Sequence, residues 1–258
     1  MSKKIGLALS GGGARGFAHV GVIKALAAHG IRFDMIAGTS AGSLVGGALA
    51  AGLSADEVEA MARRAGYLNT MRPSFSPRGL LSNAPLGEFL RREYPVDRFE
   101  DTAIPFAATA YDIKAGEEVV MQGEGDMIFA IRASCSVPGV FVPLKDADGR
   151  ILVDGAVSSA LPAAIARKMG ADIVIAVDVL ACGGTFMTNP RTALGIAVRS
   201  TLSLIRSSSR NQHYLADIVI EPAISHLRPD QIGKRDEFIA LGEKAGNERV
   251  DEILKLIG

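Results

Sequence analysis

Residues 35–50 read MIAGTSAGSLVGGALA, and the change of character in the middle of this stretch decides the fold class. Met35 to Ala37 form a short apolar run that predicts a buried strand, and the small residues Ala41 to Ala51 predict a helix. Between them lies Gly38-Thr39-Ser40-Ala41-Gly42, a G-x-S-x-G sequence. In a strand–turn–helix setting, this sequence is typical of a sharp turn that exposes a serine hydroxyl.

A nucleophilic role for Ser40 has a physical basis in this setting. The backbone of such a turn is strained, and Gly38 and Gly42 remove Cβ atoms that would clash there. The following helix directs its N-terminus at the serine, where its dipole favours developing negative charge. Because the chain has 29 glycines, the same letters also fit an ordinary glycine-rich turn with a capping serine.

A second glycine-rich loop precedes this turn, between a strand predicted over Ile5 to Leu9 and a helix predicted over Phe17 to Ala28. Consecutive glycines let the backbone aim several N–H groups at one point, so the loop is a candidate oxyanion hole beside Ser40. Arg15 either adds positive charge to this site or braces the loop from outside. The candidate oxyanion and substrate-binding residues are Gly11, Gly12, Gly13, Ala14, Arg15, Gly16 and Ala41.

The same loop also fits a dinucleotide-binding fingerprint, which would make the chain an oxidoreductase. Gly11, Gly13 and Gly16 match G-x-G-x-x-G between a strand and a helix. The acidic residue that holds the ribose should end the second strand, but Asp34 precedes that strand. The strand ends instead at the Ser40 turn, so this alternative is the weaker one.

The candidate base for Ser40 is Asp154. An apolar run, Ile151 to Val153, ends at Asp154-Gly155-Ala156, and Gly155 lets the chain turn away at once. Because the carboxyl ends of parallel strands gather at the ligand-binding edge of a sheet, we expect Asp154 to meet Ser40 there. Asp178, at the end of a strand predicted over Ile173 to Val179, is a weaker competitor.

A histidine base is the alternative, and two histidines follow Asp154 in the chain. His213 lies in a polar helical setting and His226 lies in a loop near Pro229. Neither has a flanking signal for catalysis, so both are expected at the surface. The four histidines form no cluster with ligand spacing, and we expect no metal site.

The remaining sequence predicts one α/β domain over residues 1–258 with a largely parallel sheet. Residues 67–85 carry three prolines, which predicts a loop. Its apolar side chains have two possible roles: they form a lid or contact lipid, or they pack on the body of the protein. Further predicted strands are Phe106–Tyr111, Glu118–Gln122, Ile151–Asp154 and Ile218–Ile220, and further predicted helices are Ala55–Ala65, Asp126–Ser134, Thr192–Ser207 and Asp236–Leu256.

Composition excludes several classes of protein. The chain has 28 basic and 28 acidic residues, so no overall field attracts nucleic acid. We find no secretory signal and no apolar run long enough to span a membrane. Cys135 and Cys182 are too far apart for a CxxC motif and are expected to be reduced thiols, which favours a cytoplasmic protein, with peripheral contact at the inner membrane surface left open.

Together these motifs resemble the patatin-like phospholipases, of the bacterial type related to the neuropathy-target-esterase catalytic domain. Residues 11–16 match the oxyanion motif of that family, residues 38–42 match its nucleophile motif, and residues 154–156 match its Asp-Gly-Gly/Ala motif. A further family segment is resembled by Ala133, Ser134, Pro138, Phe141 and Pro143.

The resemblance implies a three-layer α/β/α fold and a Ser40–Asp154 dyad without histidine, metal or cofactor. It also implies esterase or phospholipase A-type activity on a lipid or lysophospholipid ester, through an acyl-Ser40 intermediate. In place of an Asn-x-Pro-like stretch after the aspartate, this chain has residues 158–161 (SSAL) before Pro162. A regulatory or scaffolding protein with the same motif geometry is the second possibility, because motifs alone do not demonstrate turnover.

Overall fold

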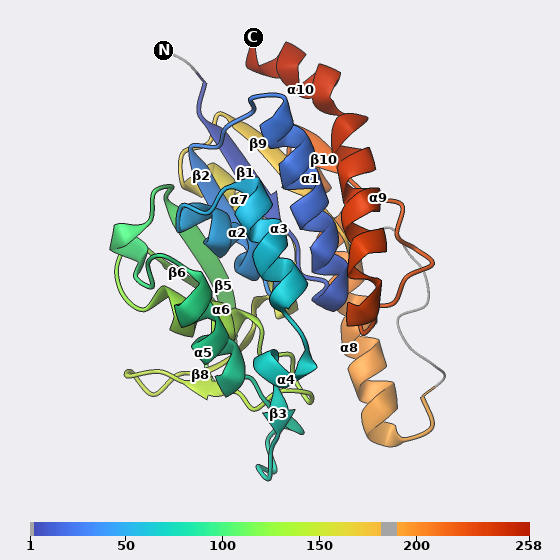
Figure 1. The fold of residues 1–258 in the computed structure, drawn as a ribbon. Coiled ribbons are helices and arrows are strands. Elements are labelled where there is room, and N and C mark those ends of the chain that lie inside the picture. The colour runs from blue at the N-terminus through green and yellow to red at the C-terminus, as the bar shows by residue number, and fades with distance from the viewer. Residues whose placement is uncertain (1–2, 182–189) are drawn as a thin grey trace.

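The computed structural model describes residues 3–181 and 190–258, which fold around a mixed, mostly parallel sheet (Figure 1). The strand order is β10-β9-β1-β2-β5-β8-β7, and β6 pairs with β5. The pairs β10–β9, β9–β1, β1–β2 and β2–β5 are parallel. These strands are β1 (Ile5–Leu9), β2 (Met35–Gly38), β5 (Phe106–Asp112), β6 (Glu117–Gln122), β7 (Leu144–Lys145), β8 (Ile151–Asp154), β9 (Ile173–Val177) and β10 (Ile218–Ile220).

Alternating side chains of the buried strands build two cores, one on each face of the sheet. On β1, Leu7 and Leu9 pack into the larger core under α1, α2, α3 and α9, whereas Ala8 packs with α7 on the opposite face. Figure 1 shows α1 and α9 side by side in front of the sheet. The expected three-layer α/β/α arrangement is therefore confirmed.

The strand that carries the candidate base runs against the direction expected from the sequence. β8 pairs antiparallel with β5, with Asp154 opposite Ala110. β2 pairs parallel with the same strand, with Gly38 opposite Ala108, while β6 occupies the other edge of β5. β2 and β8 therefore approach each other end to end along one edge of β5. Asp154 meets the residues after Gly38 for this reason, and not because both strands run in parallel.

The helices largely follow the sequence predictions, with three differences. Helix α5 was not predicted because Pro85 reads as a breaker, although proline is well tolerated in the first helical turn, where it lies here. The short helix α7 was missed, and the expected C-terminal helix is divided at Glu248 and Arg249. The helices are α1 (Phe17–Ala28), α2 (Ala41–Ala50), α3 (Ala55–Arg64), α4 (Tyr67–Thr70), α5 (Ala84–Glu93), α6 (Met127–Ser134), α7 (Ala163–Lys168), α8 (Ala193–Arg210), α9 (Arg235–Asn247) and α10 (Val250–Ile257).

The segment predicted as a loop, residues 67–85, contains regular structure. After the single turn of α4, the chain forms an antiparallel ribbon of β3 (Arg72–Pro73) and β4 (Leu81–Ser82). This ribbon projects from the lower end of the molecule in Figure 1, below α4. We refer to residues 71–82 as the hairpin.

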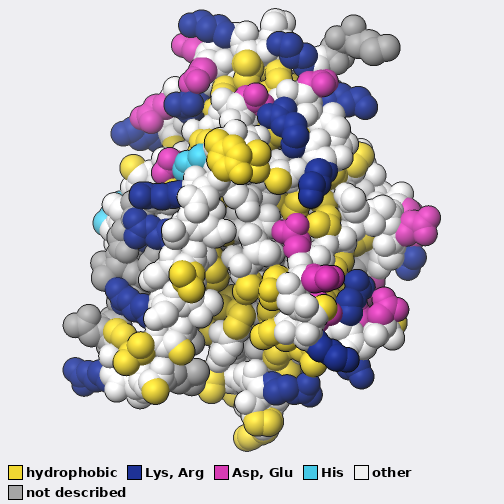
Figure 2. Space-filling view, turned by 180° about the vertical axis from the view of Figure 1, so that it is seen from behind, with side chains coloured by type: hydrophobic (Ala, Val, Ile, Leu, Met, Phe, Trp, Pro, Cys, Tyr) yellow, Lys and Arg dark blue, Asp and Glu magenta, His cyan; other side chains and the backbone are white. Residues whose placement is uncertain are grey.

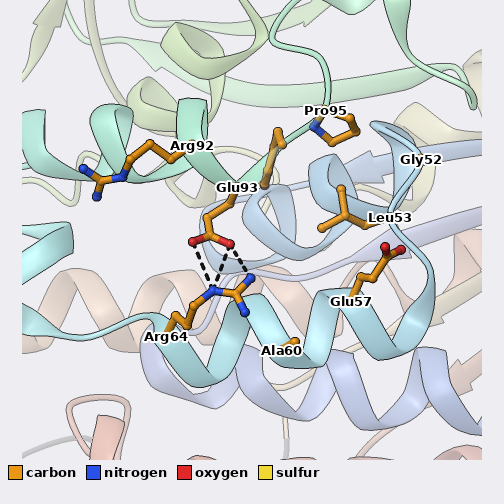
Figure 3. A pocket seen from close by; sticks show the side chains of 9 residues that line it. Gly52, Leu53, Glu57, Ala60, Arg64, Arg92, Glu93 and Pro95 are labelled. Carbon is orange, nitrogen blue, oxygen red and sulfur yellow. Dashed lines mark hydrogen bonds and ion pairs between the residues drawn. The ribbon is translucent and has the colours of Figure 1, made fainter.

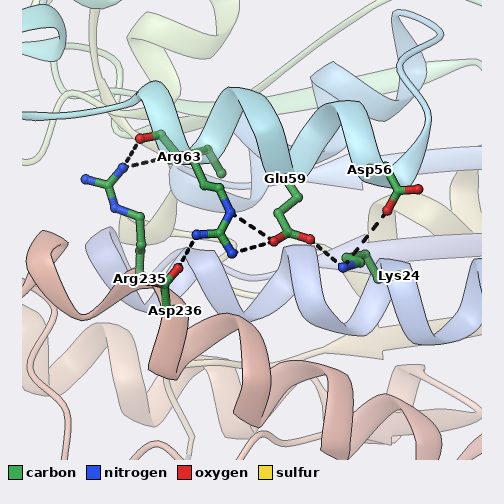
Figure 4. Close-up of polar contacts among 7 residues, drawn as sticks. Lys24, Asp56, Glu59, Arg63, Arg235 and Asp236 are labelled. Atoms are coloured by element: carbon green, nitrogen blue, oxygen red, sulfur yellow. Dashed lines mark hydrogen bonds and ion pairs between the residues drawn. The ribbon is translucent and has the colours of Figure 1, made fainter.

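Ion pairs tie the front helices to one another (Figure 4). Glu59 on α3 pairs with Lys24 on α1, and Arg63 on α3 pairs with Asp236 on α9 at 2.5 Å. Arg235 donates to the carbonyl of Arg63 at the C-terminal end of α3. None of the helices in the described part of the chain is both long and apolar enough to cross a membrane.

Candidate active site

The candidate nucleophile lies on a strained strand-to-helix turn, as its sequence predicts. Ser40 joins β2 to α2 with φ 51° and ψ −122°, and it is the one non-glycine residue with positive φ among those the structure describes. Such a conformation costs on the order of 1–3 kcal/mol and persists only where surrounding contacts enforce it. Its N–H donates to Ser134 Oγ at 2.8 Å, and its carbonyl accepts from Ser43 Oγ at 2.6 Å.

Close packing around the turn explains the flanking glycines. A Cβ on Gly42 would lie 2.2 Å from the carbonyl oxygen of Leu9, and one on Gly38 would lie 2.6 Å from the carbonyl oxygen of Gly42. Both obstacles are backbone atoms that a rotamer change cannot move. The turn is therefore fitted tightly against the end of β1, so no larger residue can occupy either position.

Asp154 is buried beside Ser40, where the end-to-end meeting of β2 and β8 places it. Its carboxylate accepts a hydrogen bond from Ala156 N–H at 2.9 Å, and the Ser40 hydroxyl lies close enough to favour its ionised form. Burial raises the pKa of Asp154 from 3.8 to about 7, against the opposing effect of these two groups. A carboxyl group with this pKa can accept a proton near neutral pH.

The glycine-rich loop lies against the nucleophile, but its N–H groups differ in their availability. A Cβ on Gly11 would be 3.3 Å from Ser40 Cβ, which places the loop in contact with the turn. The Gly11 N–H donates to the Ala160 carbonyl at 3.0 Å, and the Ala14 N–H donates to the Pro229 carbonyl at 2.8 Å. These two amides already donate hydrogen bonds to other carbonyl groups. Fewer amides of the loop are therefore available to bind an oxyanion than the sequence suggests.

Three amides of the loop and the turn have no acceptor within the described chain, namely those of Gly12, Gly13 and Ala41. Gly16 has a packing role, since a Cβ there would come within 2.5 Å of Ala41 Cβ. Gly155, the glycine of the aspartate motif, likewise packs closely, against Thr109 on β5. The amides that remain for an oxyanion are thus fewer than the sequence indicated.

Arg15 holds the loop from inside, which corrects the expectation of an external brace. Its side chain is fully buried, and Nε and Nη2 donate to the Leu227 carbonyl at 3.0 and 2.8 Å. The guanidinium therefore connects the loop to the segment before α9. Of the two roles left open by the sequence, the structure shows the bracing contact.

The segment after Asp154 supports both halves of the site through its main chain. The Ser159 carbonyl accepts from Thr39 Oγ1 at 2.7 Å, and the Ala160 carbonyl accepts from the Gly11 N–H. Thr39 Oγ1 also lies 2.8 Å from Thr109 Oγ1, so β5 is connected to the turn. The segment makes these contacts through main-chain carbonyl groups, so they do not require the side chains of an Asn-x-Pro-like stretch. The loop and the turn therefore remain connected in this chain.

The histidines make their contacts away from the Ser40–Asp154 pair. His213 Nε2 lies 2.8 Å from Asp178 Oδ2, and His226 Nε2 lies 3.0 Å from Glu237 Oε1. His19 is fully buried, and its Nε2 bonds to the Ser10 carbonyl. Burial lowers the pKa of His19 to about 4, so its ring is neutral at pH 7.

Asp178 is fully engaged by its own neighbours. One carboxylate oxygen accepts from the N–H groups of Leu180 and Ala181, and the other accepts from Ser209 Oγ and faces His213. Although burial opposes ionisation, these bonds lower the pKa of Asp178, while Asp178 raises the pKa of His213. This cluster joins the end of β9 to the C-terminal end of α8.

Two residues next to the nucleophile, Ser134 and Cys135, are absent from the site residues predicted from the sequence. Ser134 belongs to the segment around α6 that resembles the family, whereas nothing in the sequence indicates a place for Cys135 in the site. Burial, followed by the charge of Asp154, raises the pKa of the Cys135 thiol, and the nearby Ser43 and Ser40 side chains lower it to a smaller extent. Cys135 is a free thiol, and Cys182 lies outside the described residues.

The position of Asp34 does not fit the dinucleotide-binding alternative. The described residues contain no group of His, Cys, Asp and Glu side chains arranged to hold a metal ion. Asp34 lies at the amino end of β2, where its carboxylate accepts the Ile5 N–H at 2.7 Å, at the opposite edge of the sheet from the glycine-rich loop. The ribose-binding role considered for this residue is therefore excluded by its position.

A surface hollow of about 500 Å³ lies between α3 and α5 (Figure 3). Its lining includes Leu53, Tyr94 and the ion pair of Arg64 with Glu93, whose Nη2 and Oε2 atoms are 2.5 Å apart. Neither Ser40, Asp154 nor the glycine-rich loop contributes to it. This hollow is therefore separate from the candidate active site.

The fold and the site define an α/β protein with a serine–carboxylate pair at the carboxyl edge of β2. A sequence model described as patatin-like phospholipase matches residues 7–167, which include the glycine-rich loop, Ser40 and Asp154. The chain belongs to the patatin-like phospholipase family, as the resemblance of its motifs indicated.

Relatives of known sequence agree with this assignment. The chain is 40% identical over 181 residues to an uncharacterized NTE family protein of Mycobacterium tuberculosis, covering 69% of this chain and 49% of the relative. It is 35% identical over 184 residues to human patatin-like phospholipase domain-containing protein 6, covering 68% of this chain and 13% of that protein. The chain thus spans about half the length of the mycobacterial relative and a smaller part of the human one.

A solved structure shows the same fold. VipD from Legionella pneumophila matches with a TM-score of 0.58 over 98% of this chain and 67% of its own chain. The sequences are only 13% identical, so this likeness concerns the fold alone.

Proposed function

We propose that the chain is a serine acyl hydrolase that releases fatty acid from a lipid ester with Ser40 as nucleophile and Asp154 as base. The observation that carries this proposal is the position of a buried carboxylate beside the Ser40 side chain, where burial raises the pKa of Asp154 to about 7. Membership of the patatin-like phospholipase family supports a lipid ester as the substrate class.

The first half of the reaction forms an acyl-enzyme. Asp154 accepts the Ser40 hydroxyl proton while Oγ attacks the ester carbonyl carbon. The oxyanion is bound by the unengaged amides of Gly12, Gly13 and Ala41, with the N-terminus of α2 adding a favourable dipole. When the tetrahedral intermediate collapses, the C–O bond breaks and protonated Asp154 returns its proton to the departing alcohol.

The second half repeats these steps with water. Ionised Asp154 accepts a proton from water, and the resulting hydroxide attacks the acyl carbonyl within the same set of amides. Collapse releases the fatty acid, and Asp154 returns the proton to Ser40 Oγ. The overall reaction consumes one water and requires neither a histidine nor an external acid.

Burial makes a lone carboxylate adequate for this work. An aspartate with its ordinary pKa is a weak base toward a serine hydroxyl, and a pKa near 7 reduces the mismatch. Cys135 lies beside the pair, but its raised pKa keeps it a protonated thiol and therefore a poor nucleophile. Ser40 is thus the better-activated of the two adjacent side chains.

The test is steady-state hydrolysis of a water-soluble short-chain nitrophenyl ester. We expect Ser40→Ala and Asp154→Asn each to reduce kcat by about a thousandfold or more, because each removes a group that acts in the transition state. His226→Ala is the matched control, since this exposed side chain bonds only to Glu237, and it should retain full activity. Full activity in either dyad variant would overturn the proposal, and an inactive wild type would favour a regulatory or scaffolding role.

A further inference from the structure

The charges of this chain are unevenly distributed along the sequence. Although basic and acidic residues balance overall at 28 each, residues 67–87 contain two arginines and no acidic residue. Residues 190–216 contain four arginines and, again, no acidic residue. These two segments are therefore cationic in a protein whose net charge is zero.

Both segments also expose large apolar side chains. Phe75 at the hairpin tip is fully exposed, as is Leu68 on α4, and Leu80 is 61% exposed. On α8, Ile196 and Leu204 are 55% and 71% exposed. Apolar side chains gathered in this way on a monomer commonly mark a binding surface.

The hairpin is connected directly to the segment that supports the dyad. Leu81 exchanges backbone hydrogen bonds with Val140 and Val142, each 2.9 Å long. That partner segment follows Ser134 and Cys135, which contact the Ser40 turn. The hairpin therefore extends outward from the wall of the candidate active site.

Helix α8 is connected to the other side of the dyad. Ile205 and Leu202 pack against Ala156 and Ala160, in the segment that follows Asp154. Figure 1 shows the N-terminal half of α8 projecting at the same lower end of the molecule as the hairpin. Each of the two projecting elements is thus connected to a segment that adjoins the Ser40–Asp154 pair.

The space-filling view shows the surface character of this end. In Figure 2, hydrophobic and Lys or Arg side chains gather at the lower end, while the Asp and Glu side chains seen in this view lie higher. Arg72, Arg78 and Arg191 are exposed, and neither hairpin arginine has an ion-pair partner among the described residues. This end of the molecule therefore exposes cationic as well as apolar side chains.

We propose that these elements form a docking face for an anionic phospholipid surface, which delivers a lipid ester to Ser40. The docking face consists of Leu68, Arg72, Phe75, Arg78, Leu80, Arg191, Ile196 and Leu204. The proposal rests on the proposed hydrolase function for its purpose, but the binding it describes is measurable without catalysis.

Charge complementarity indicates that the docking face binds an anionic lipid surface. Apolar side chains enter the boundary between headgroups and acyl chains, and arginines at the same depth pair with anionic headgroups. A second copy of this chain would instead oppose arginines to arginines, which disfavours self-association through this face. An anionic lipid surface satisfies both the apolar and the cationic side chains at once.

The experiment is cosedimentation of the Ser40→Ala protein with vesicles, so that hydrolysis cannot alter the lipid. One set of vesicles contains phosphatidylcholine alone, and the other contains equal amounts of phosphatidylcholine and phosphatidylglycerol. We expect binding to the mixed vesicles at least about tenfold tighter than to phosphatidylcholine, weakening as salt is raised. Equal binding to both vesicles, or none to either, would overturn the proposal.

Two double variants test the composition of the face. Arg72→Gln with Arg78→Gln should weaken binding to the mixed vesicles on the order of thirtyfold, and Phe75→Ser with Leu80→Ser on the order of tenfold. The control, Lys3→Gln with Lys255→Gln, removes two exposed cations at the opposite end of the molecule (Figure 1) and should bind like the parent. An equal loss in the control would contradict the proposed face.

Failure of this proposal is distinguishable from failure of the proposed function. With Ser40 present, the hairpin variants should hydrolyse the soluble nitrophenyl ester at the wild-type rate, because their side chains lie outside the dyad. If the protein binds vesicles but is inactive on the soluble ester, the docking proposal holds and the proposed hydrolase function is wrong. If it hydrolyses the ester but does not bind anionic vesicles selectively, the proposed function holds and the docking proposal is wrong.

Discussion

The candidate dyad and the proposed docking face are built in opposite ways. Around Ser40, backbone atoms of Leu9, Gly38 and Gly42 are in close contact, and the one strained non-glycine residue of the described chain is held there. At the hairpin, the side chains of Phe75 and Leu80 are exposed to solvent. Close packing fixes the geometry of the candidate active site. The proposed docking face instead consists of exposed side chains that contribute little to the stability of the fold.

The largest expected effect is at the packed side of this comparison. Gly42→Ala should destabilise the fold by more than about 3 kcal/mol, because the new Cβ meets the Leu9 carbonyl oxygen at 2.2 Å. Gly233→Ala is the control, since a Cβ there meets nothing within 4 Å. Urea unfolding of both variants measures the difference, and similar midpoints would show that the turn is not tightly packed.

Asp154→Asn should separate activity from stability. The folded-state pKa of about 7 exceeds the ordinary 3.8, so the folded protein binds the proton more tightly than the unfolded chain. Wild-type stability should therefore fall as pH rises from about 4 to 7, a penalty that asparagine avoids. At pH 8 we expect the inactive variant to be more stable by about 1–3 kcal/mol, with the gain shrinking toward pH 4. A variant that is less stable at every pH would contradict a buried ionised carboxylate.

The pH dependence of activity follows from the same group. Because the ionised form of Asp154 is the base, kcat/KM on the soluble ester should rise about tenfold per pH unit below 7 and level off above it. A pH–rate profile over this range measures the apparent pKa. A midpoint near 4 would mean that the reacting carboxylate is not desolvated.

A smaller effect is expected where α8 is attached to the body. Asp178 raises the pKa of His213, so this contact stabilises the fold fully below the ordinary pKa of histidine, and the contribution is lost as pH rises through the folded-state value. His213→Ala should cost about 1 kcal/mol at pH 6 and less at pH 9. Thermal unfolding at the two pH values provides the measurement, and a cost independent of pH would exclude an ionic contact.

The smallest effect is expected at the exposed side of the comparison. Phe75→Ser should change the free energy of unfolding by no more than about 0.5 kcal/mol, because the side chain is fully exposed. Urea unfolding would measure it beside Gly42→Ala. A large loss would show that the hairpin tip packs on the body, which is the alternative that the sequence left open for residues 67–85.

The sequence predicts the site well where chemistry and local turn geometry impose the same residues. Backbone atoms around Ser40 leave no room for a Cβ at Gly38 or Gly42, so the turn requires glycine at both positions. A short motif is therefore enough to identify the turn from the sequence. The structure places Asp154 beside Ser40 by a different arrangement of strands from the one that the sequence suggests. The antiparallel course of β8 depends on pairing with β5, more than 35 residues earlier, which local patterns do not encode.

Other features depend on contacts that sequence patterns do not carry. The engagement of the Gly11 and Ala14 amides requires the Ala160 and Pro229 carbonyls, which come from distant segments. The inward position of Arg15 requires the Leu227 carbonyl in the same way. Cys135 enters the site only through tertiary packing of α6. The single-domain organisation and the cytoplasmic location stay predictions.

The central claim is that Ser40 is activated by Asp154 alone. The most direct measurement is labelling of the folded protein with a fluorophosphonate, with the adduct located by peptide mass spectrometry. We expect an adduct on Ser40 that forms in the His213→Ala and His226→Ala variants but is lost in Asp154→Asn. Absence of an adduct on the folded wild-type protein, or unchanged labelling of Asp154→Asn, would contradict it.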